Sequence, residues 1–195
     1  MRRQPARGVV VSLGLLVAGC GLLGDPDAVL PIEDVRTTGR ELPGTLAGNP
    51  TGPHVEILTG TVGGEDIEVV AQRDGPGICL AVRRAPEGST GCGPLPDADP
   101  IGRGFGMLLP AGLPPEDGSA PPLQVAGLLS AEVSAVVIEL VDGRDARALL
   151  FSLAPAEVEG SGFVAYLPAD EVGWSVVALS SDGSELGRLE YASGH

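Results

Sequence analysis

Three cysteines, at positions 20, 79 and 92, are the residues best suited to covalent chemistry in this sequence. No two of them have the Cys-x-x-Cys spacing of redox and zinc sites, and the only imidazoles are those of His54 and His195. Cys20 ends a basic and then apolar amino-terminal segment, whereas the other two cysteines lie in the body of the chain. We therefore consider Cys20 separately and expect Cys79 and Cys92 to pair.

A bridge between Cys79 and Cys92 would close a loop of 14 residues. Two thiols in an oxidising compartment normally form a disulfide, and loop closure predicts about 3 kcal/mol of stabilisation. Residues 83–91 between them are typical of a strand end, a turn and a return. The alternative is a redox or metal-binding pair, which the spacing and the scarcity of histidine disfavour.

The sequence contains no recognisable catalytic constellation. It has no Gly-x-Ser-x-Gly and no His-Glu-x-x-His, it has no lysine for a Ser-x-x-Lys site, and a Ser-His-Asp site would have to use His54. Glycosidase-type carboxylate pairs stay open because 26 acids supply many candidates. Aromatic platforms for sugars are nevertheless scarce, since Trp174 is the only tryptophan. We predict a non-catalytic protein with no catalytic residue, no cofactor and no metal.

Two short segments bear a partial resemblance to ligand loops. Asp97 and Asp99 followed by Gly102 form an incomplete acidic loop that lacks the remaining ligands of a calcium-binding EF-hand, so a solvated loop is the preferred interpretation. Residues 102–106 are rich in glycine, but no helix is expected after them to bind phosphate, and they are typical of a strand entry. Asp142 and Asp182, each followed by glycine, are predicted to be turn residues.

The amino terminus has the three parts of a secretory signal. Arg2, Arg3 and Arg7 precede an apolar run of about ten residues, too short for a membrane-spanning helix. The run ends in Leu16-Val17-Ala18-Gly19-Cys20, which resembles the lipobox of bacterial lipoproteins. The resemblance implies that residues 1–19 are removed and that Cys20 carries a lipid thioether. The protein would then be extracytoplasmic and fixed to the cell membrane by lipid.

The composition limits the class of partner. The chain has 26 acidic residues against 12 basic ones, all of them arginine. Without the three arginines of the signal, 9 would remain and the formal charge would be −17. This charge argues against nucleic acid, which requires clustered basic residues, and leaves an envelope protein or glycan as the expected partner. Arginine without lysine, with 30 Gly and 18 Pro, suggests a GC-rich, actinobacterial source.

Beyond the signal we expect a flexible lipidated tether over residues 20–53, followed by an all-β domain over residues 54–192. Alternating β-branched residues and glycine turns predict strands over 54–62, 66–73, 78–83 and 105–109. The Pro- and Gly-rich segment 110–122 can be neither helix nor strand interior, so it is either a long loop or a boundary between two halves, 54–109 and 123–192. These alternatives remain open.

The second half has the clearer pattern. Strands are predicted over 123–129, 134–141, 144–153, 162–168, 172–180 and 184–191, with hairpin turns at Asp142-Gly143 and Asp182-Gly183. Many short strands without helical periodicity favour an antiparallel β-sandwich of the immunoglobulin-like type. This half resembles domains of actinobacterial surface lipoproteins, a resemblance that implies no particular activity.

These observations favour a surface module that binds a partner or has a structural role. Two alternatives are a carrier of an apolar ligand such as a lipid, and a hydrolase of unrecognised type. An apolar cavity would support the carrier, and a pocket with carboxylates of raised pKa would support the hydrolase.

Overall fold

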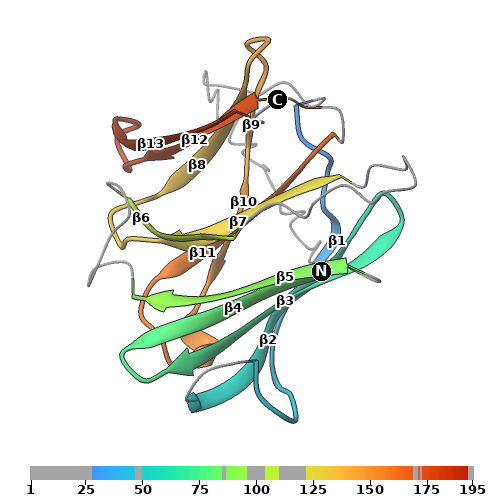
Figure 1. The fold of residues 1–195 in the computed structure, drawn as a ribbon, viewed down its shortest axis with the longest axis vertical. Coiled ribbons are helices and arrows are strands. Elements are labelled where there is room, and N and C mark those ends of the chain that lie inside the picture. The colour runs from blue at the N-terminus through green and yellow to red at the C-terminus, as the bar shows by residue number, and fades with distance from the viewer. Residues whose placement is uncertain are drawn as a thin grey trace, which may run out of the picture.

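The computed structural model describes residues 28–46, 50–84, 87–95, 104–109, 122–168, 171 and 173–192. Apart from one short 3-10 turn, η1 (Ala154–Ala156), the regular structure in these residues is β, arranged in three antiparallel sheets (Figure 1). The all-β antiparallel architecture predicted from the sequence is therefore confirmed.

Sheet A has five strands in sequence order, β1 (Glu33–Glu41), β2 (Pro50–Val62), β3 (Glu65–Asp74), β4 (Gly77–Arg84) and β5 (Glu87–Pro94). Sheet B has the order β10 (Leu149–Ser152), β11 (Ser161–Leu167), β7 (Leu123–Leu129) and β6 (Phe105–Leu109). Sheet C has the order β13 (Glu185–Ala192), β12 (Gly173–Leu179), β8 (Ala135–Leu140) and β9 (Asp145–Arg147).

Sheet B is the middle layer, with sheet A on one face and sheet C on the other (Figure 1). Alternate residues of β11 enter different cores: Val164 and Tyr166 pack with sheet A, whereas Phe163, Ala165 and Leu167 pack with sheet C. We call these the A/B core and the B/C core. Because side chains alternate between the two faces of a strand, β11 needs apolar residues at consecutive positions, and Gly162–Leu167 are all buried.

The central pair of strands in sheet B depends on a glycine. A Cβ atom on Gly127 would lie 2.3 Å from the backbone oxygen of Met107 and 2.9 Å from Cε1 of Phe163, its cross-strand partner. The Phe163 ring therefore occupies space that any side chain at position 127 would need. It meets Phe105 edge to face, with ring centroids 6.3 Å apart, and fills the centre of the B/C core.

A polar contact crosses the A/B core. The Gln124 amide nitrogen on β7 donates a hydrogen bond to the Ser89 hydroxyl on β5, and the Tyr166 hydroxyl lies 3.5 Å from the Gln124 amide oxygen. Burial raises the pKa of Tyr166 to about 12, although the nearby charge of Arg84 opposes this shift. Tyr166 therefore stays neutral under physiological conditions, and the contact through Ser89, Gln124 and Tyr166 joins the two sheets through neutral groups.

The predicted turn residues occupy hairpin turns. Gly143 and Gly183 have φ of +87° and +83°, values that glycine adopts without strain. Asp142 accepts a hydrogen bond from the Arg144 backbone nitrogen at 3.0 Å, and Asp182 accepts one from that of Ser184 at 3.0 Å. Hydrogen bonds from Ser180 and Ser184 lower the pKa of Asp182 to about 2. Both aspartates therefore stabilise turns, as the sequence analysis expected.

Two domain boundaries differ from the prediction. The described part of the supposed tether, 20–53, contains β1, which pairs along β2, and β2 itself begins at Pro50, so the prediction of a flexible tether is wrong for these residues. In addition, the alternative of two halves divided at 110–122 is wrong, because β6 and β7, on either side of that segment, pair within sheet B. The change from sheet A to sheet B falls between Pro94 and Phe105.

The predicted strand 144–153 is in fact two strands. Asp145–Arg147 pairs with β8 in sheet C, and Leu149–Ser152 pairs with β11 in sheet B. The chain changes sheets at Ala148, whose backbone nitrogen donates to Val136 O at 3.0 Å. Residues 144–153 contain no Gly or Pro to mark the change of sheet, so the break could not be predicted from the sequence.

Candidate functional site

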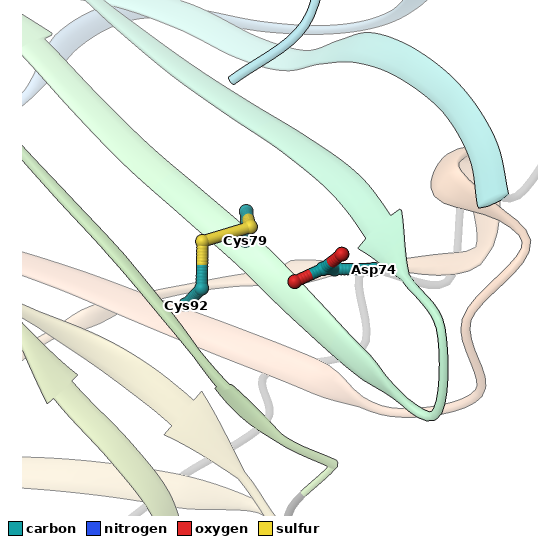
Figure 2. A group of neighbouring side chains, drawn as sticks. All are labelled: Asp74, Cys79 and Cys92. Carbon is teal, nitrogen blue, oxygen red and sulfur yellow. A yellow bond between two sulfur atoms is a disulfide. The ribbon is translucent and has the colours of Figure 1, made fainter. Parts of the chain in front are cut away.

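Cys79 and Cys92 lie directly opposite each other on β4 and β5, at disulfide-bonding distance with an S–S separation of 2.05 Å. The Asp74 carboxylate at the end of β3 lies within 4.8 Å of the sulfurs, and Figure 2 shows it directed toward them. A thiolate is the form of cysteine that binds metals, and a disulfide removes it. The group is therefore best explained as a structural cross-strand bridge, as the spacing of the cysteines predicted.

Among the described residues, the other candidates singled out in the sequence do not come together in a site. His54 is buried on β2, with Nδ1 3.1 Å from Pro43 O, and its cross-strand neighbour is Gln72. Gly104 precedes β6, as expected for a strand entry. Other candidates lie outside the described residues, namely Cys20, Asp97, Asp99, Gly102 and His195.

An open depression of about 940 Å³ lies on the face of sheet A that points away from sheet B. Its floor follows one row of cross-strand neighbours through all five strands. The row consists of Arg36, Thr59, Glu68, Arg83 and Gly88. The other lining residues are Asp34, Gly60, Thr61, Asp66, Ile67 and Thr90.

A β-bulge makes this row possible. The pairing of β2 with β3 shifts between Glu56 and Leu58, so Glu56 and Thr59 both face outward although they are three residues apart. Without the shift, the period of two would place one of them in the A/B core. The bulge thus brings the carboxylates of Glu56 and Glu68 within hydrogen-bonding range on the outer face.

Two ion pairs lie beside the depression. Arg40 Nη2 lies 2.5 Å from Glu56 Oε2, and Arg83 Nη1 lies 3.1 Å from Glu68 Oε2. Burial opposes the ionised form of Glu56, but hydrogen bonds from Arg40 and Thr38 and the charge of Arg40 outweigh it, so the pKa of Glu56 is lowered. A carboxylate held ionised in this way is poorly suited to act as a general acid, which requires a raised pKa.

The depression is suited to hydrogen bonding. Arg36 makes no ion pair with any of the described residues, and the hydroxyls of Thr59, Thr61 and Thr90 line the same surface. The lining is mainly charged and hydroxyl-bearing, unlike the apolar cavity expected of a lipid carrier. The arrangement can therefore bind a polar molecule through a guanidinium and several hydroxyls.

The pKa of Glu56 leads to a test by pH. Because the carboxyl is ionised more readily in the folded protein, its contribution to stability is present above the unfolded pKa and is lost as pH falls through the folded pKa. We expect Glu56→Gln to cost about 1–2 kcal/mol at pH 6. The difference should shrink toward pH 3 in urea unfolding. Glu132→Gln, at an exposed turn, is the control, and parallel pH curves for wild type and Glu56→Gln would contradict the assignment.

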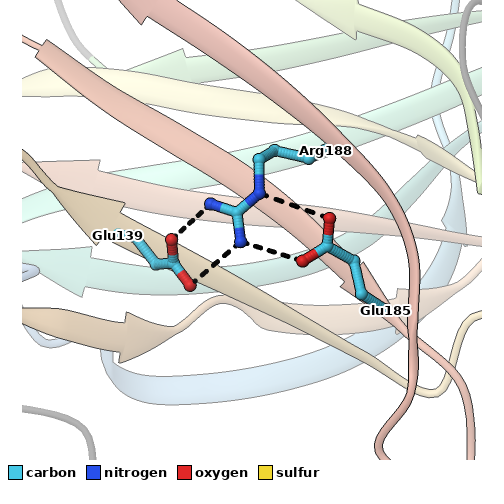
Figure 3. A network of polar contacts seen from close by, with 3 residues as sticks. All are labelled: Glu139, Glu185 and Arg188. Carbon is cyan, nitrogen blue, oxygen red and sulfur yellow. Dashed lines mark hydrogen bonds and ion pairs between the residues drawn. The ribbon is translucent and has the colours of Figure 1, made fainter.

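The outer face of sheet C carries a second charged network. Arg188 on β13 bonds Glu139 on β8 and lies 2.8 Å from Glu185 Oε2, as Figure 3 shows. β12 separates β13 from β8, and its Val177 is only 2% exposed and lies opposite both Arg188 and Val137. The network therefore covers Val177 and links β13 to β8 across β12, so we interpret it as structural.

The sequence search overlooked one pair of aromatic residues. Trp174 and Tyr191 stand opposite each other on β12 and β13, with ring centroids 4.2 Å apart and planes 17° apart. Tyr191 is 41% exposed, and Val141, whose backbone nitrogen donates to Gly173 O, is 77% exposed at the same end of sheet C, on its other face. The Asp182-Gly183 hairpin turn could have indicated this pair, because residues equally distant from the turn on the two strands lie opposite each other. The bulge between Ala178 and Leu179 shifts that count by one residue.

Comparisons with known proteins identify no relative of this chain. No protein-family model, curated protein or solved structure matches this chain. In the part of the chain that the structure describes, no helix has the length and apolarity to cross a membrane.

Proposed function

We propose that this chain is an extracytoplasmic lipoprotein, anchored by lipid on Cys20, whose β domain is a non-catalytic module that binds a polar envelope component. The observation that carries the binding role is the row of Arg36, Thr59, Glu68, Arg83 and Gly88 across the depression. A protein or glycan fits this surface, because guanidinium and hydroxyl groups bind carbonyl, carboxylate and hydroxyl groups.

Three features support the extracytoplasmic location. The lipobox-like segment ends at Cys20, and the basic and apolar segments before it have the order of a signal peptide. The Cys79–Cys92 pair is what an oxidising compartment allows. The strongly acidic composition favours solubility and disfavours nucleic acid as a ligand.

An immunoglobulin-like form for residues 104–192 is part of the proposal. Sheet B has the order β6-β7-β11-β10 and sheet C the order β13-β12-β8-β9. If β6 is strand A, the first order is A-B-E-D, and the second is G-F-C with one further strand next to C. Sheet A would then be an additional five-stranded layer that covers the A-B-E-D sheet and carries the binding surface.

The anchor is tested by mass spectrometry of the mature amino terminus. We expect the wild-type protein to begin at Cys20 and to carry the mass of a diacylglyceryl group, and a Cys20→Ser variant to lack it. As a control, residues 21–195 behind an ordinary cleavable signal should be released from the membrane. A wild-type chain with unmodified Cys20 would refute the lipoprotein assignment.

The binding role is tested with the released domain on glycans and proteins isolated from the cell envelope. Arg36→Ala and Thr59→Trp should each reduce binding at least about tenfold, the loss of roughly 1.4 kcal/mol, since one removes the Arg36 guanidinium from the depression and the other fills it. Arg147→Ala, on β9 at the edge of sheet C, is the matched control. Equal binding by all four proteins would exclude the depression as the site.

A further inference from the structure

The end of sheet C near the carboxyl terminus presents apolar side chains to solvent. Tyr191, stacked on the half-buried Trp174, and Val141, beside Gly173 on the opposite face of the sheet, make up this end, which we call the apolar end. Only three large hydrophobic side chains are markedly exposed in the described residues, and two of them, Val141 and Tyr191, belong to it. A cluster of exposed apolar groups marks a contact surface more often than scattered ones do.

The amino-terminal part of the described chain approaches the same end. Ala28 is fully buried in the B/C core, against which Trp174 also packs, and the Leu30 backbone nitrogen donates to Tyr166 O at 2.7 Å. Tyr166 is the penultimate residue of β11, and only a short connection, residues 168–172, separates that strand from the start of β12 and Trp174. Both the entry of the chain and the apolar end are therefore at one end of the molecule.

The length of chain before Ala28 limits the distance to the anchor. Seven residues, 21–27, separate Cys20 from Ala28, in place of the tether of more than thirty that the sequence suggested. Even a fully extended chain of this length spans at most about 28 Å. A lipid on Cys20 would thus hold this end of the domain near the membrane surface and keep its effective concentration there high.

We propose that the apolar end docks on the lipid surface, with Val141, Tyr191 and the edge of Trp174 at the level of the headgroups. This inference rests on the proposed lipidation of Cys20. Tryptophan and tyrosine favour the membrane interface because their rings are amphipathic. The charged neighbours Asp142, Arg144 and Glu171 are linked by ion pairs of 2.6 and 2.5 Å, so their charges are partly compensated where they approach the headgroups.

Docking in this way gives the binding surface an orientation. Sheets A and C lie on opposite faces of sheet B, and the depression is on the face of sheet A that points away from sheet B (Figure 1). With the apolar end on the lipid, the depression stays accessible to envelope components.

Trp174 is the only tryptophan of the protein, so its fluorescence reports on this end alone. The full lipidated protein is reconstituted into phosphatidylcholine vesicles with and without bromine on the acyl chains. We expect bromine to quench Trp174. Val141→Asp should abolish most of the quenching, because it places a charge in the interface. The matched control Val35→Asp, at a 41% exposed position on β1, should leave the quenching unchanged.

The outcomes separate the two proposals. Failure of the wild-type protein to float with the vesicles would refute the lipid anchor. Flotation without quenching of Trp174 would overturn membrane docking while leaving the anchor intact. Equal quenching of wild type and Val141→Asp would also overturn it, and a Trp174 emission shift caused only by soluble glycans would assign the apolar end to sugar binding instead.

Discussion

Replacing Phe163 with alanine is expected to lower the free energy of unfolding by about 3–5 kcal/mol. The ring is fully buried at the centre of the B/C core, contacts Phe105 edge to face, and lies over Gly127. Its removal leaves a cavity that the backbone of β7 cannot fill, because Gly127 has no side chain to move into the space. The loss is a large fraction of the about 5–15 kcal/mol typical of a folded domain.

Urea unfolding of the released domain measures this effect. Phe163→Leu, which keeps most of the volume, should cost less than about 1.5 kcal/mol, and Val141→Ala, at a 77% exposed position, should stay within about 0.5 kcal/mol of wild type. A loss below about 1 kcal/mol for Phe163→Ala would show that the middle sheet collapses around the gap, contrary to the packing described.

Removing the Cys79–Cys92 disulfide is expected to cost about 3 kcal/mol. The bridge joins directly opposed residues of β4 and β5 and restricts the unfolded chain between them. Alanine is the better replacement at both positions, since Cys79 is fully buried and a serine hydroxyl there would need a new hydrogen-bond partner. The double variant Cys79→Ala/Cys92→Ala is compared with wild type by urea unfolding.

Two controls separate the bond from the side chains. Reduced wild type should unfold at about the same urea concentration as the double variant, whereas oxidised wild type should be more resistant. The exported domain with residue 20 replaced by serine should show no free thiol in an Ellman titration under denaturing conditions, and two after reduction. Two free thiols before reduction would contradict the bridge.

Much of the strand pattern could be predicted because short-range signals specify it. Glycine pairs and Asp-Gly turns mark the hairpins β2–β3, β8–β9 and β12–β13. β1 escaped notice because Glu33–Glu41 is exposed at every position and its pairing with β2 shifts twice. An edge strand with neither face buried has no apolar alternation to detect, and its charges and bulges protect the edge from other chains.

The layers and the binding surface could not be read in the same way. Whether β11 is covered on one face or two depends on which strands become its neighbours, and those come from distant parts of the chain. The row that contains Arg36 and Glu68 depends on the registers of four strand pairs and on one bulge. A slip of one residue in any of these registers would turn the side chains of a strand to the opposite face of the sheet. Close approach of sheet A to β6 likewise depends on Gly91, where a Cβ atom would lie 2.7 Å from Leu109 Cδ2.

The strand order also determines how the protein can assemble as it emerges amino end first. Every strand of sheet A pairs with its neighbour in sequence, so all five can join once Pro94 has emerged. Sheet B must wait for β11, which ends at Leu167, because that strand lies between β10 and β7. In the interval the apolar face of sheet A, with Ile57 and Leu80, lacks its cover. We expect the first sheet to form early through local contacts, and the emerging chain to be most prone to aggregate before the second is complete.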